Sequence, residues 1–348
     1  MKEIYLDNAA TTKVDEKVAK AMQSYLTENY GNPSSLHFKG QEAKRGVEEA
    51  RGIIAREIGA KFKDIIFTGS GTEANNFVIK GLFLKEQTIK SGKNHIITTK
   101  IEHDCILNAC KWVVTQGGKV TYLDVDATGF VNPQDVADAI TEKTILVSVI
   151  HGNNEIGTIQ HLQEIGKICQ EKNVLFHTDA CQSFTKVPIK IKKMNLDLMT
   201  INAHKIHGPK GVGALYIREG IKITPLLHGG GQEFKLRSST ENVPGIVGFG
   251  KAVQVASNRD VKRIKKLRDY FIEKITNEIS NVSLNGPSRE DRLCNNINLC
   301  FNNIEGEAIG SFLNSAGIFT STGSACSSKN LDPSHVLLAI GKTPLEAN

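Results

Sequence analysis

The stretch that decides the fold is residues 196–205, which read Leu-Asp-Leu-Met-Thr-Ile-Asn-Ala-His-Lys. Residues 196–201 have the length and composition of a buried strand, and Lys205 follows within four residues. Residues 174–177 form a similar stretch that leads to Asp179. In parallel α/β sheets, ligands bind beyond the carboxyl ends of the strands. Because Asp179 and Lys205 lie 26 residues apart, about one strand–connection–strand step, we expect them to face one cleft from neighbouring strands.

Further short apolar stretches lie on both sides of these two and alternate with helical or turn-rich segments. This alternation predicts an α/β fold with a mostly parallel sheet and helices on both faces. The other predicted strands are residues 65–68, 95–99, 120–123, 144–150 and 211–217.

The pattern changes near residue 256, and a length of 348 residues is compatible with two domains. We predict a large domain over residues 15–256 and a smaller α+β domain made of residues 1–14 and 257–348. The elements predicted near and after the boundary are a long connecting helix over 251–280, a strand over 295–301, and helices over 306–316 and 334–340.

The composition excludes several classes of protein. With 40% apolar and 23% charged residues, the chain is not intrinsically disordered. No apolar run approaches the ~18 residues of a membrane span, and the N-terminus lacks a signal sequence, so we expect a cytoplasmic protein without membrane contact. Seven cysteines without a C-x-x-C pair fit a reducing compartment. A net charge of +6 and a pI of 8.8 do not predict nucleic-acid binding.

Three further groups of residues carry chemistry. Gly69-Ser70-Gly71-Thr72-Glu73 lies between a predicted strand and a helix, so it is either a phosphate-binding turn or a plain capping turn. His103 follows a strand and is either structural or part of a site; without a second His/Cys pair at ligand spacing, we do not expect zinc. Cys326 lies in the small, polar stretch 321–328, so it is either an incidental exposed cysteine or a reactive thiol.

Asp179 also has two interpretations: it caps the next helix, or it meets a cation or a protonated nitrogen. Lys205 lies after a buried strand and between two histidines, where it can be desolvated and lose the proton that blocks attack on a carbonyl. Together these residues outline a site for an aldehyde cofactor. Lys205 would form the covalent bond, Asp179 would meet a pyridinium nitrogen, the Gly-rich turn would hold a phosphate, and His103 would stack on the ring.

The chain resembles the cysteine desulfurases of the NifS/IscS type, in the class V aminotransferase group of pyridoxal-phosphate enzymes. The resemblance runs from residue 4 to residue 347 and implies the fold type I architecture, with pyridoxal 5'-phosphate as cofactor. Its motifs are Leu-Asp-Asn-Ala-Ala-Thr-Thr (6–12), Gly-Asn-Pro-Ser-Ser (31–35), Asn-Asn-Glu-Ile-Gly (153–157), His-Lys-Ile-His-Gly-Pro-Lys-Gly (204–211), His-Gly-Gly-Gly-Gln-Glu (228–233) and Ser-Ala-Cys (324–326).

The resemblance also implies roles for individual residues. Lys205 binds the cofactor aldehyde, Asp179 contacts the pyridine nitrogen, and His103 stacks on the ring and handles protons. Cys326 is the sulfur-accepting nucleophile; no resident metal is implied, only contact of Cys326 with an iron–sulfur cluster during transfer. The other implied contacts are those of Gly71, Thr72, Asn202 (where the family usually has a serine) and His204 with the phosphate, of Gln182 and Asn154 with the phenolate oxygen, of Asn154 with the substrate, and of Thr240 with the phosphate in a partner subunit.

The implied reaction converts L-cysteine to L-alanine and leaves a persulfide on a homodimeric enzyme, for iron–sulfur scaffolds or tRNA-thiolating proteins. The alternatives are a selenocysteine lyase or aminotransferase on the same scaffold, and a truncated paralogue that acts only as a binding partner. The last alternative arises because family members continue past residue 348 through a segment with a substrate-binding arginine. We therefore expect this chain to handle L-cysteine with a raised KM.

Overall fold

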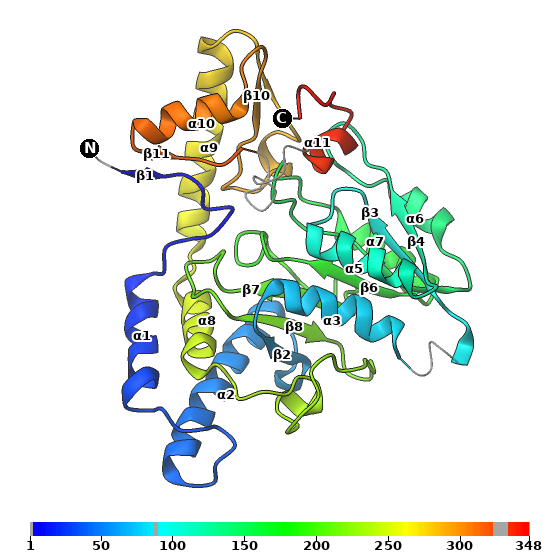
Figure 1. Ribbon diagram of the computed structural model, residues 1–348, viewed down its shortest axis with the longest axis vertical. Helices are drawn as coiled ribbons and strands as arrows, with labels where there is room; N and C mark the ends of the chain where they lie inside the picture. Colours follow the sequence, from blue (N-terminus) through cyan, green and yellow to red (C-terminus); the bar gives the residue numbers. More distant parts are fainter. Residues whose placement is uncertain (1–2, 86–89, 323–332, 348) are drawn as a thin grey trace.

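The computed structural model describes residues 3–85, 90–322 and 333–347. Its centre is a seven-stranded sheet with the order β2-β8-β7-β6-β5-β3-β4 (Figure 1). Within this sheet β8 runs antiparallel to both of its neighbours, and the other pairs are parallel, so the predicted mostly parallel sheet is confirmed. The strands are β2 (Ile65–Thr68), β3 (His95–Thr99), β4 (Lys119–Leu123), β5 (Thr144–Ser148), β6 (Leu175–Asp179), β7 (Leu198–Asn202) and β8 (Gly213–Ile217).

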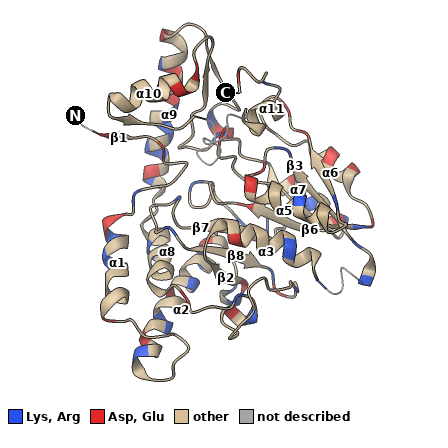
Figure 2. Cartoon of the chain, in the orientation of Figure 1, with Lys and Arg blue, Asp and Glu red and all other residues tan. Residues whose placement is uncertain are grey.

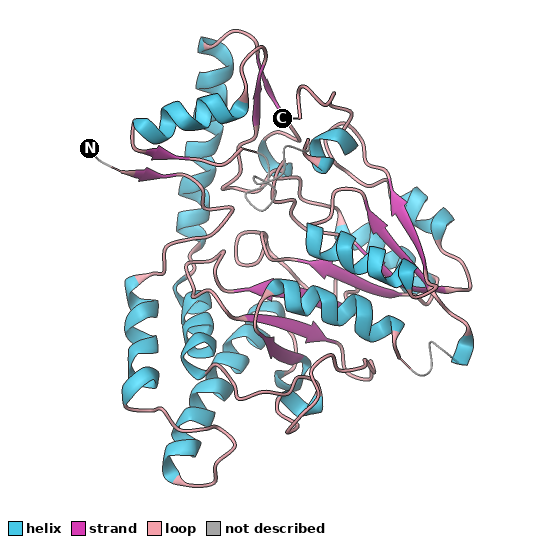
Figure 3. Cartoon of the chain, in the orientation of Figure 1, coloured by secondary structure: helices cyan, strands magenta, loops and turns pink. Residues whose placement is uncertain are grey.

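Helices cover both faces of the sheet (Figure 3). Successive strand residues point to opposite faces, and Ile96 and Ile97 accordingly belong to two different apolar cores. Because a core lies on each face of the sheet, β5 and β7 are buried along their whole length, and their sequences are largely apolar. The helices on one face are α3 (Gly71–Phe83) and α5 (Asp104–Thr115), and those that contribute to the other core are α1 (Glu16–Thr27), α2 (Phe38–Ile58), α6 (Pro133–Ala139), α7 (Leu162–Glu171) and α8 (Val243–Val255).

The predicted continuous helix over residues 251–280 is wrong. Helix α8 ends at Val255, and α9 (Asn258–Glu278) begins after a break. Ala256 has extended backbone angles (φ −59°, ψ 134°), and the Ser257 side chain caps α9 by accepting a hydrogen bond from the backbone N–H of Arg259. Serine is a preferred N-cap residue, but the apolar spacing continues across the break and hid it.

The residues after α9 form smaller elements beside the main sheet (Figure 1). Strands β9 (Val282–Leu284) and β10 (Leu299–Phe301) pair antiparallel, whereas β1 (Ile4–Tyr5) pairs in parallel with β11 (Ile318–Phe319). The second pair joins the N-terminal residues to the later part of the chain, which is compatible with the predicted domain division. The division at residue 256 stays a prediction. The remaining elements are the helices α10 (Gly306–Ser315) and α11 (His335–Ala339) and the short 3-10 helices η1 (Phe62–Asp64), η2 (Glu233–Lys235) and η3 (Arg289–Asp291).

Charged residues of both signs are mixed along α9 (Figure 2), where Lys274 pairs with Glu278 and Arg263 pairs with Asp260. Helix α9 contains seven Lys and Arg residues and four Asp and Glu residues, so these pairs offset only part of its positive charge. Among the described residues, no helix combines the length and apolar character needed to cross a membrane.

Candidate active site

Asp179 is the last residue of β6, and its side chain is buried. Its Oδ2 atom accepts a hydrogen bond from Asn75 Nδ2 at 2.6 Å, and its Oδ1 atom accepts one from the backbone N–H of Cys181 at 2.9 Å. The second bond closes a turn. Residues 180–197 form turns and no helix between β6 and β7, so the interpretation that Asp179 caps the next helix is wrong. Both donors are neutral, so the negative charge remains available to a cationic group of a ligand.

Lys205 lies three residues after β7, which pairs in parallel with β6. Its Nζ atom donates hydrogen bonds to the carbonyl oxygen of Ala9 and, at 2.7 Å, to that of Ala10. Gln182 Nε2 donates to the same Ala9 oxygen at 2.8 Å. The N-terminal segment thus brings Lys205 and Gln182 together at the edge of the sheet that also holds Asp179.

The Gly-rich turn opens α3 at Gly71, and the side chain of Ser70 caps the first turn. Ser70 thus caps the helix, and phosphate binding by this turn stays a prediction, because the N-terminus of a capped helix also suits an anion. A Cβ atom on Gly71 would lie 2.6 Å from Cys181 Sγ and 3.4 Å from Asn202 Nδ2. Gly71 is therefore packed closely against Cys181, and a larger residue at this position would clash with that sulfur.

His204 lies between β7 and Lys205, with its Nδ1 atom 3.2 Å from Thr11 Oγ1. Burial lowers the pKa of His204 to about 4, and the positive charge of Lys205 acts in the same direction. The imidazole is therefore neutral near pH 7 and carries a single N–H donor.

His103 directly precedes α5, and its Nδ1 atom accepts a hydrogen bond from the backbone N–H of Cys105 at 3.2 Å. The adjacent Glu102 is completely buried, and its Oε1 atom accepts from the backbone N–H of Ile150 and from Thr99 Oγ1. Burial raises the pKa of Glu102 to about 8. His103 thus has a structural role as a helix cap, and its predicted stacking role stays a prediction.

Two predicted site residues, Asn154 and Thr240, share no hydrogen bond with this group within the described part of the chain. Asn154 is half-buried, and its backbone oxygen accepts a hydrogen bond from Asn296 Nδ2 at 3.3 Å. Thr240 is exposed between η2 and α8. Cys326 lies outside the described residues.

Burial makes several of the described thiols poor nucleophiles. It raises the pKa of Cys110 and of Cys169 to about 12, and it raises the pKa of Cys181 well above its ordinary value. A thiol with such a pKa is protonated near neutral pH and reacts slowly. These three cysteines therefore do not compete with Cys326 for the predicted role. Within the described ranges, no group of three His, Cys, Asp or Glu side chains is placed to hold a metal ion.

Sequence reasoning missed Asn75 and Thr12. Asn75 is a buried polar residue on α3, four residues after Gly71, and that unusual position was the available signal. The Thr12 hydroxyl donates to the backbone oxygen of His204 and accepts from the backbone N–H of His207, each at 2.8 Å. No local pattern predicts this contact, because Thr12 and His204 are 192 residues apart in the sequence.

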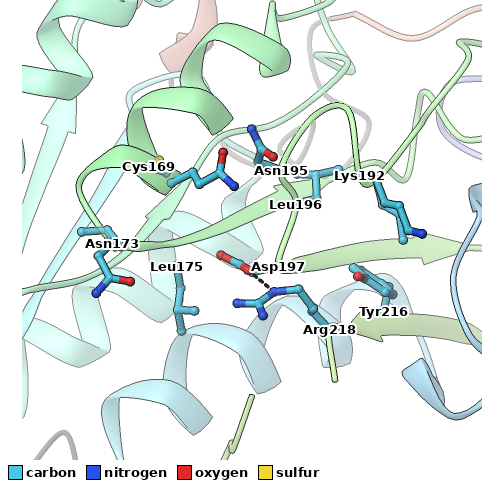
Figure 4. A pocket seen from close by; sticks show the side chains of 12 residues that line it. Cys169, Asn173, Leu175, Lys192, Asn195, Leu196, Asp197, Tyr216 and Arg218 are labelled. Atoms are coloured by element: carbon cyan, nitrogen blue, oxygen red, sulfur yellow. Dashed lines mark hydrogen bonds and ion pairs between the residues drawn. The ribbon is translucent and has the colours of Figure 1, made fainter. Parts of the chain in front are cut away.

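A hollow of about 390 Å³ lies at the opposite edge of the sheet, where β6 and β7 begin (Figure 4). Asp197 and Arg218 form an ion pair in it, with 2.6 Å between Oδ1 and Nε. Asp197 Oδ2 also accepts from the backbone N–H of Phe176 at 2.8 Å. None of the predicted site residues lines this hollow, so it is separate from the candidate site.

Comparisons with known proteins agree with this arrangement. The family model described as aminotransferase class-V matches residues 4–344. A protein named cysteine desulfurase IscS from Dictyoglomus turgidum is 51% identical over 99% of this chain and 87% of its own length. A protein of the same name from Methanosarcina thermophila is 49% identical over 98% of this chain and 84% of its own length.

Solved structures agree as well. A NifS-like protein superposes with a TM-score of 0.90 at 38% identity, covering 100% of this chain and 92% of that protein. SspA in complex with cysteine superposes with a TM-score of 0.88 at 38% identity, covering 99% of this chain and 96% of that protein. The predicted fold type I architecture is therefore confirmed. The chain belongs to the class-V aminotransferase family, in the group of the IscS cysteine desulfurases.

Proposed function

We propose that this protein is a pyridoxal-phosphate-dependent cysteine desulfurase that converts L-cysteine to L-alanine and retains the sulfur as a persulfide on Cys326. The observation that carries the proposal is the arrangement of Asp179 and Lys205 after two neighbouring parallel strands, beside the glycine turn that opens α3. The relatives named cysteine desulfurase support the choice of reaction.

The residues at this edge of the sheet fit pyridoxal 5'-phosphate. Two buried amide oxygens, Asn75 Oδ1 and Asn202 Oδ1, have no hydrogen-bond partner among the described residues. Burying a polar atom without a partner is unfavourable, so both amides are suited to a polar ligand. The charge of Asp179 suits a protonated ring nitrogen, and the N-terminus of α3, which begins at Gly71, suits an anionic group.

Each remaining residue at this edge has a proposed binding role. Gly71, Thr72, Asn202 and His204 hold the phosphate, with His204 contributing one N–H from a neutral ring. Gln182 and Asn154 lie at the phenolate oxygen, and Asn154 also contacts the substrate. In a homodimer, the exposed Thr240 reaches the phosphate bound by a second copy of the chain.

When bound, the cofactor supplies an aldehyde that takes up the substrate amino group and a ring that draws electrons from the α-carbon. Asp179 would keep a proton on the ring nitrogen. Lys205 Nζ, once its ammonium form has given one proton to solvent, would remove and return the α-proton. His103 stacks on the ring and exchanges protons with the substrate thiol. Cys326 Sγ then forms a bond to the substrate sulfur as the bond between that sulfur and Cβ breaks. The electron pair of the broken bond stays on carbon and is protonated to give alanine, so no external oxidant is needed.

The acceptor of the sulfur and the setting are part of the same proposal. A cytoplasmic homodimer would pass the persulfide sulfur to an iron–sulfur scaffold or to a tRNA-thiolating protein. Contact between Cys326 and a cluster would then occur only during transfer.

The test uses the full chain loaded with pyridoxal phosphate. L-Cysteine is added with a thiol reductant, and alanine and sulfide are measured. We expect equal amounts of both from the unmodified chain. Lys205→Ala should show no turnover, because it removes the amine that bonds the cofactor aldehyde and moves the α-proton. Cys326→Ser should bind the cofactor and L-cysteine but release no sulfide. Cys300→Ser, which removes a half-exposed thiol outside the site, is the control.

Two results would contradict the proposal. Normal turnover by Lys205→Ala would show that Nζ is not required for the reaction. Sulfide release by Cys326→Ser at the rate of Cys300→Ser would show that Cys326 does not accept the sulfur.

A further inference from the structure

The hydroxyl group of Thr12 joins the N-terminal segment to the turn that carries Lys205. Thr12 is buried, and its Oγ1 atom donates to the His204 carbonyl and accepts from the His207 backbone N–H. The Thr12 backbone N–H also donates to the His204 carbonyl, at 2.9 Å. The Thr12 hydroxyl therefore binds the backbone before Lys205 as a donor and the backbone after Lys205 as an acceptor.

This attachment places two backbone carbonyls directly against the lysine. The oxygens of Ala9 and Ala10, which we call the carbonyl cradle, both accept hydrogen bonds from Lys205 Nζ. Gln182 Nε2 holds the Ala9 oxygen from the other side. The Tyr5 hydroxyl shares its one proton between the carbonyl oxygens of Asp7, at 3.0 Å, and Thr11, at 3.1 Å, which ties down the same segment.

The other ionisable groups near Lys205 make such acceptors necessary. Lys186 is half-buried close by, and desolvation lowers its pKa to about 8, with Lys205 contributing in the same direction. His204 is neutral near pH 7, and burial keeps the thiol of Cys181 protonated. An ammonium group beside another amine is stabilised by carbonyl oxygens that accept its hydrogen bonds.

We infer that Thr12 is a positioning residue: it holds the carbonyl cradle in place, and the cradle receives the Lys205 ammonium when an amino acid displaces Lys205 from the cofactor. The inference rests on the proposed function. In the exchange, the arriving nitrogen bonds to the aldehyde carbon as the bond from that carbon to Nζ breaks. The arriving ammonium loses two protons, and Nζ leaves with them as an ammonium, so the exchange needs no oxidant or reductant.

The test measures how readily an amino acid displaces Lys205. The cofactor-loaded chain is titrated with L-alanine, reduced with borohydride, and digested, and mass spectrometry gives the fraction of Lys205 that carries the cofactor. Thr12→Val keeps the shape of the side chain and removes the hydroxyl. We expect it to need about tenfold more L-alanine for half displacement. Without the hydroxyl the carbonyl cradle shifts and weakens a hydrogen bond to the charged Nζ, and such a bond is worth roughly that factor.

Two variants provide matched controls. Thr12→Ser restores a hydroxyl and should return the half-displacement concentration toward that of the unmodified chain. Thr27→Val removes an exposed hydroxyl that also donates to a backbone carbonyl, that of Gln23, but it lies on α1 away from the cradle. It should leave the concentration unchanged.

A second measurement separates positioning from general damage to the fold. 4'-Deoxypyridoxine phosphate lacks the aldehyde, so it binds without attaching to Lys205. Its affinity, measured by calorimetry, should be the same for the unmodified chain and for Thr12→Val. Tyr5→Phe changes an exposed residue and tests the cradle if Thr12→Val does not fold; it should raise the half-displacement concentration about two- to threefold.

The outcomes distinguish the two proposals. Equal half-displacement concentrations for the unmodified chain and for the cradle variants would overturn the inference alone. So would a parallel loss of affinity for the deoxy analogue, because that pattern indicates a structural role. An unmodified chain that never attaches pyridoxal phosphate to Lys205 would overturn the proposed function and this inference with it.

Discussion

Asp179 and Asp197 lie at opposite edges of the same sheet and have opposite surroundings. Asp197 precedes β7 and is paired with the Arg218 guanidinium and the Phe176 backbone N–H. Asp179 ends β6 and accepts hydrogen bonds from two neutral donors. The fold itself compensates the charge of Asp197, whereas the charge of Asp179 is left for a ligand. The environment of a carboxylate, more than its burial, therefore separates a structural role from a functional one.

The strongest way to break this comparison is Asp179→Asn. The proposed partner of the carboxylate is a buried, protonated ring nitrogen, and losing one member of such a pair typically costs about 2–5 kcal/mol. We expect cofactor affinity, measured by absorbance titration, to fall by roughly 30-fold to several thousand-fold. Asp197→Asn is the matched control and should bind the cofactor as tightly as the unmodified chain. Equal affinities for the two variants would contradict the assignment of Asp179.

Glu102 sharpens the comparison. It is a carboxyl group at the same edge of the sheet as Asp179, but it is protonated and neutral near pH 7. Burial raises its pKa to about 8 from 4.5. Its contribution to stability is therefore fully present below pH 4.5 and is lost as the pH rises through 8. Between these values we expect Glu102 to reduce the free energy of unfolding by about 1.4 kcal/mol per pH unit.

Glu102→Gln tests this pH dependence of stability. The free energy of unfolding of both proteins is measured in urea between pH 5 and 8, in steps of ~1 pH unit. The glutamine cannot ionise, so the stability of the variant relative to the unmodified chain should rise steadily with pH. His151 and His177, whose pKa values burial lowers to about 4, destabilise both proteins equally on the acid side and cancel in the difference. A difference that does not change with pH would show that Glu102 is ionised in the folded protein.

The parts of this arrangement that follow from local sequence were predictable. A buried strand is a short apolar run, so β6 and β7 and the positions of Asp179 and Lys205 after them followed from residues 174–205. The turn at Gly71 was also recognisable from local sequence, because its glycines directly follow the apolar run of β2. The direction of β8 was not predictable, because an antiparallel strand that is buried on both faces has the same apolar composition as a parallel one.

The parts that depend on distant residues could not be read from the sequence. The Thr12–His204 contact and the pairing of β1 with β11 join residues from the two ends of the chain. The break between α8 and α9 depends on one extended residue, Ala256, inside an uninterrupted apolar pattern. The role of Cys326 rests on the resemblance alone, because that residue lies outside the described part of the chain.

The smallest effect that we expect is on the free energy of unfolding of Asp197→Asn, the variant that tests the structural role of Asp197. The asparagine keeps an oxygen that can accept from the Phe176 backbone N–H, but it loses the ion pair with Arg218. Arg218 is 54% exposed, so water screens this pair, and we expect the free energy of unfolding to fall by only about 1 kcal/mol.

Asp124→Asn is the matched control for this prediction, because it removes a wholly surface ion pair with Lys100. Its effect should be within about 0.5 kcal/mol of zero. Urea unfolding of both variants, with and without pyridoxal phosphate, gives their free energies of unfolding and the stabilisation by the cofactor. If the cofactor stabilises Asp197→Asn less than it stabilises the unmodified chain, then the amino edge of the sheet also takes part in cofactor binding. Cofactor binding at one edge of the sheet would then be coupled to stability at the other edge. The buried strands β6 and β7, which join the two edges, would transmit this coupling.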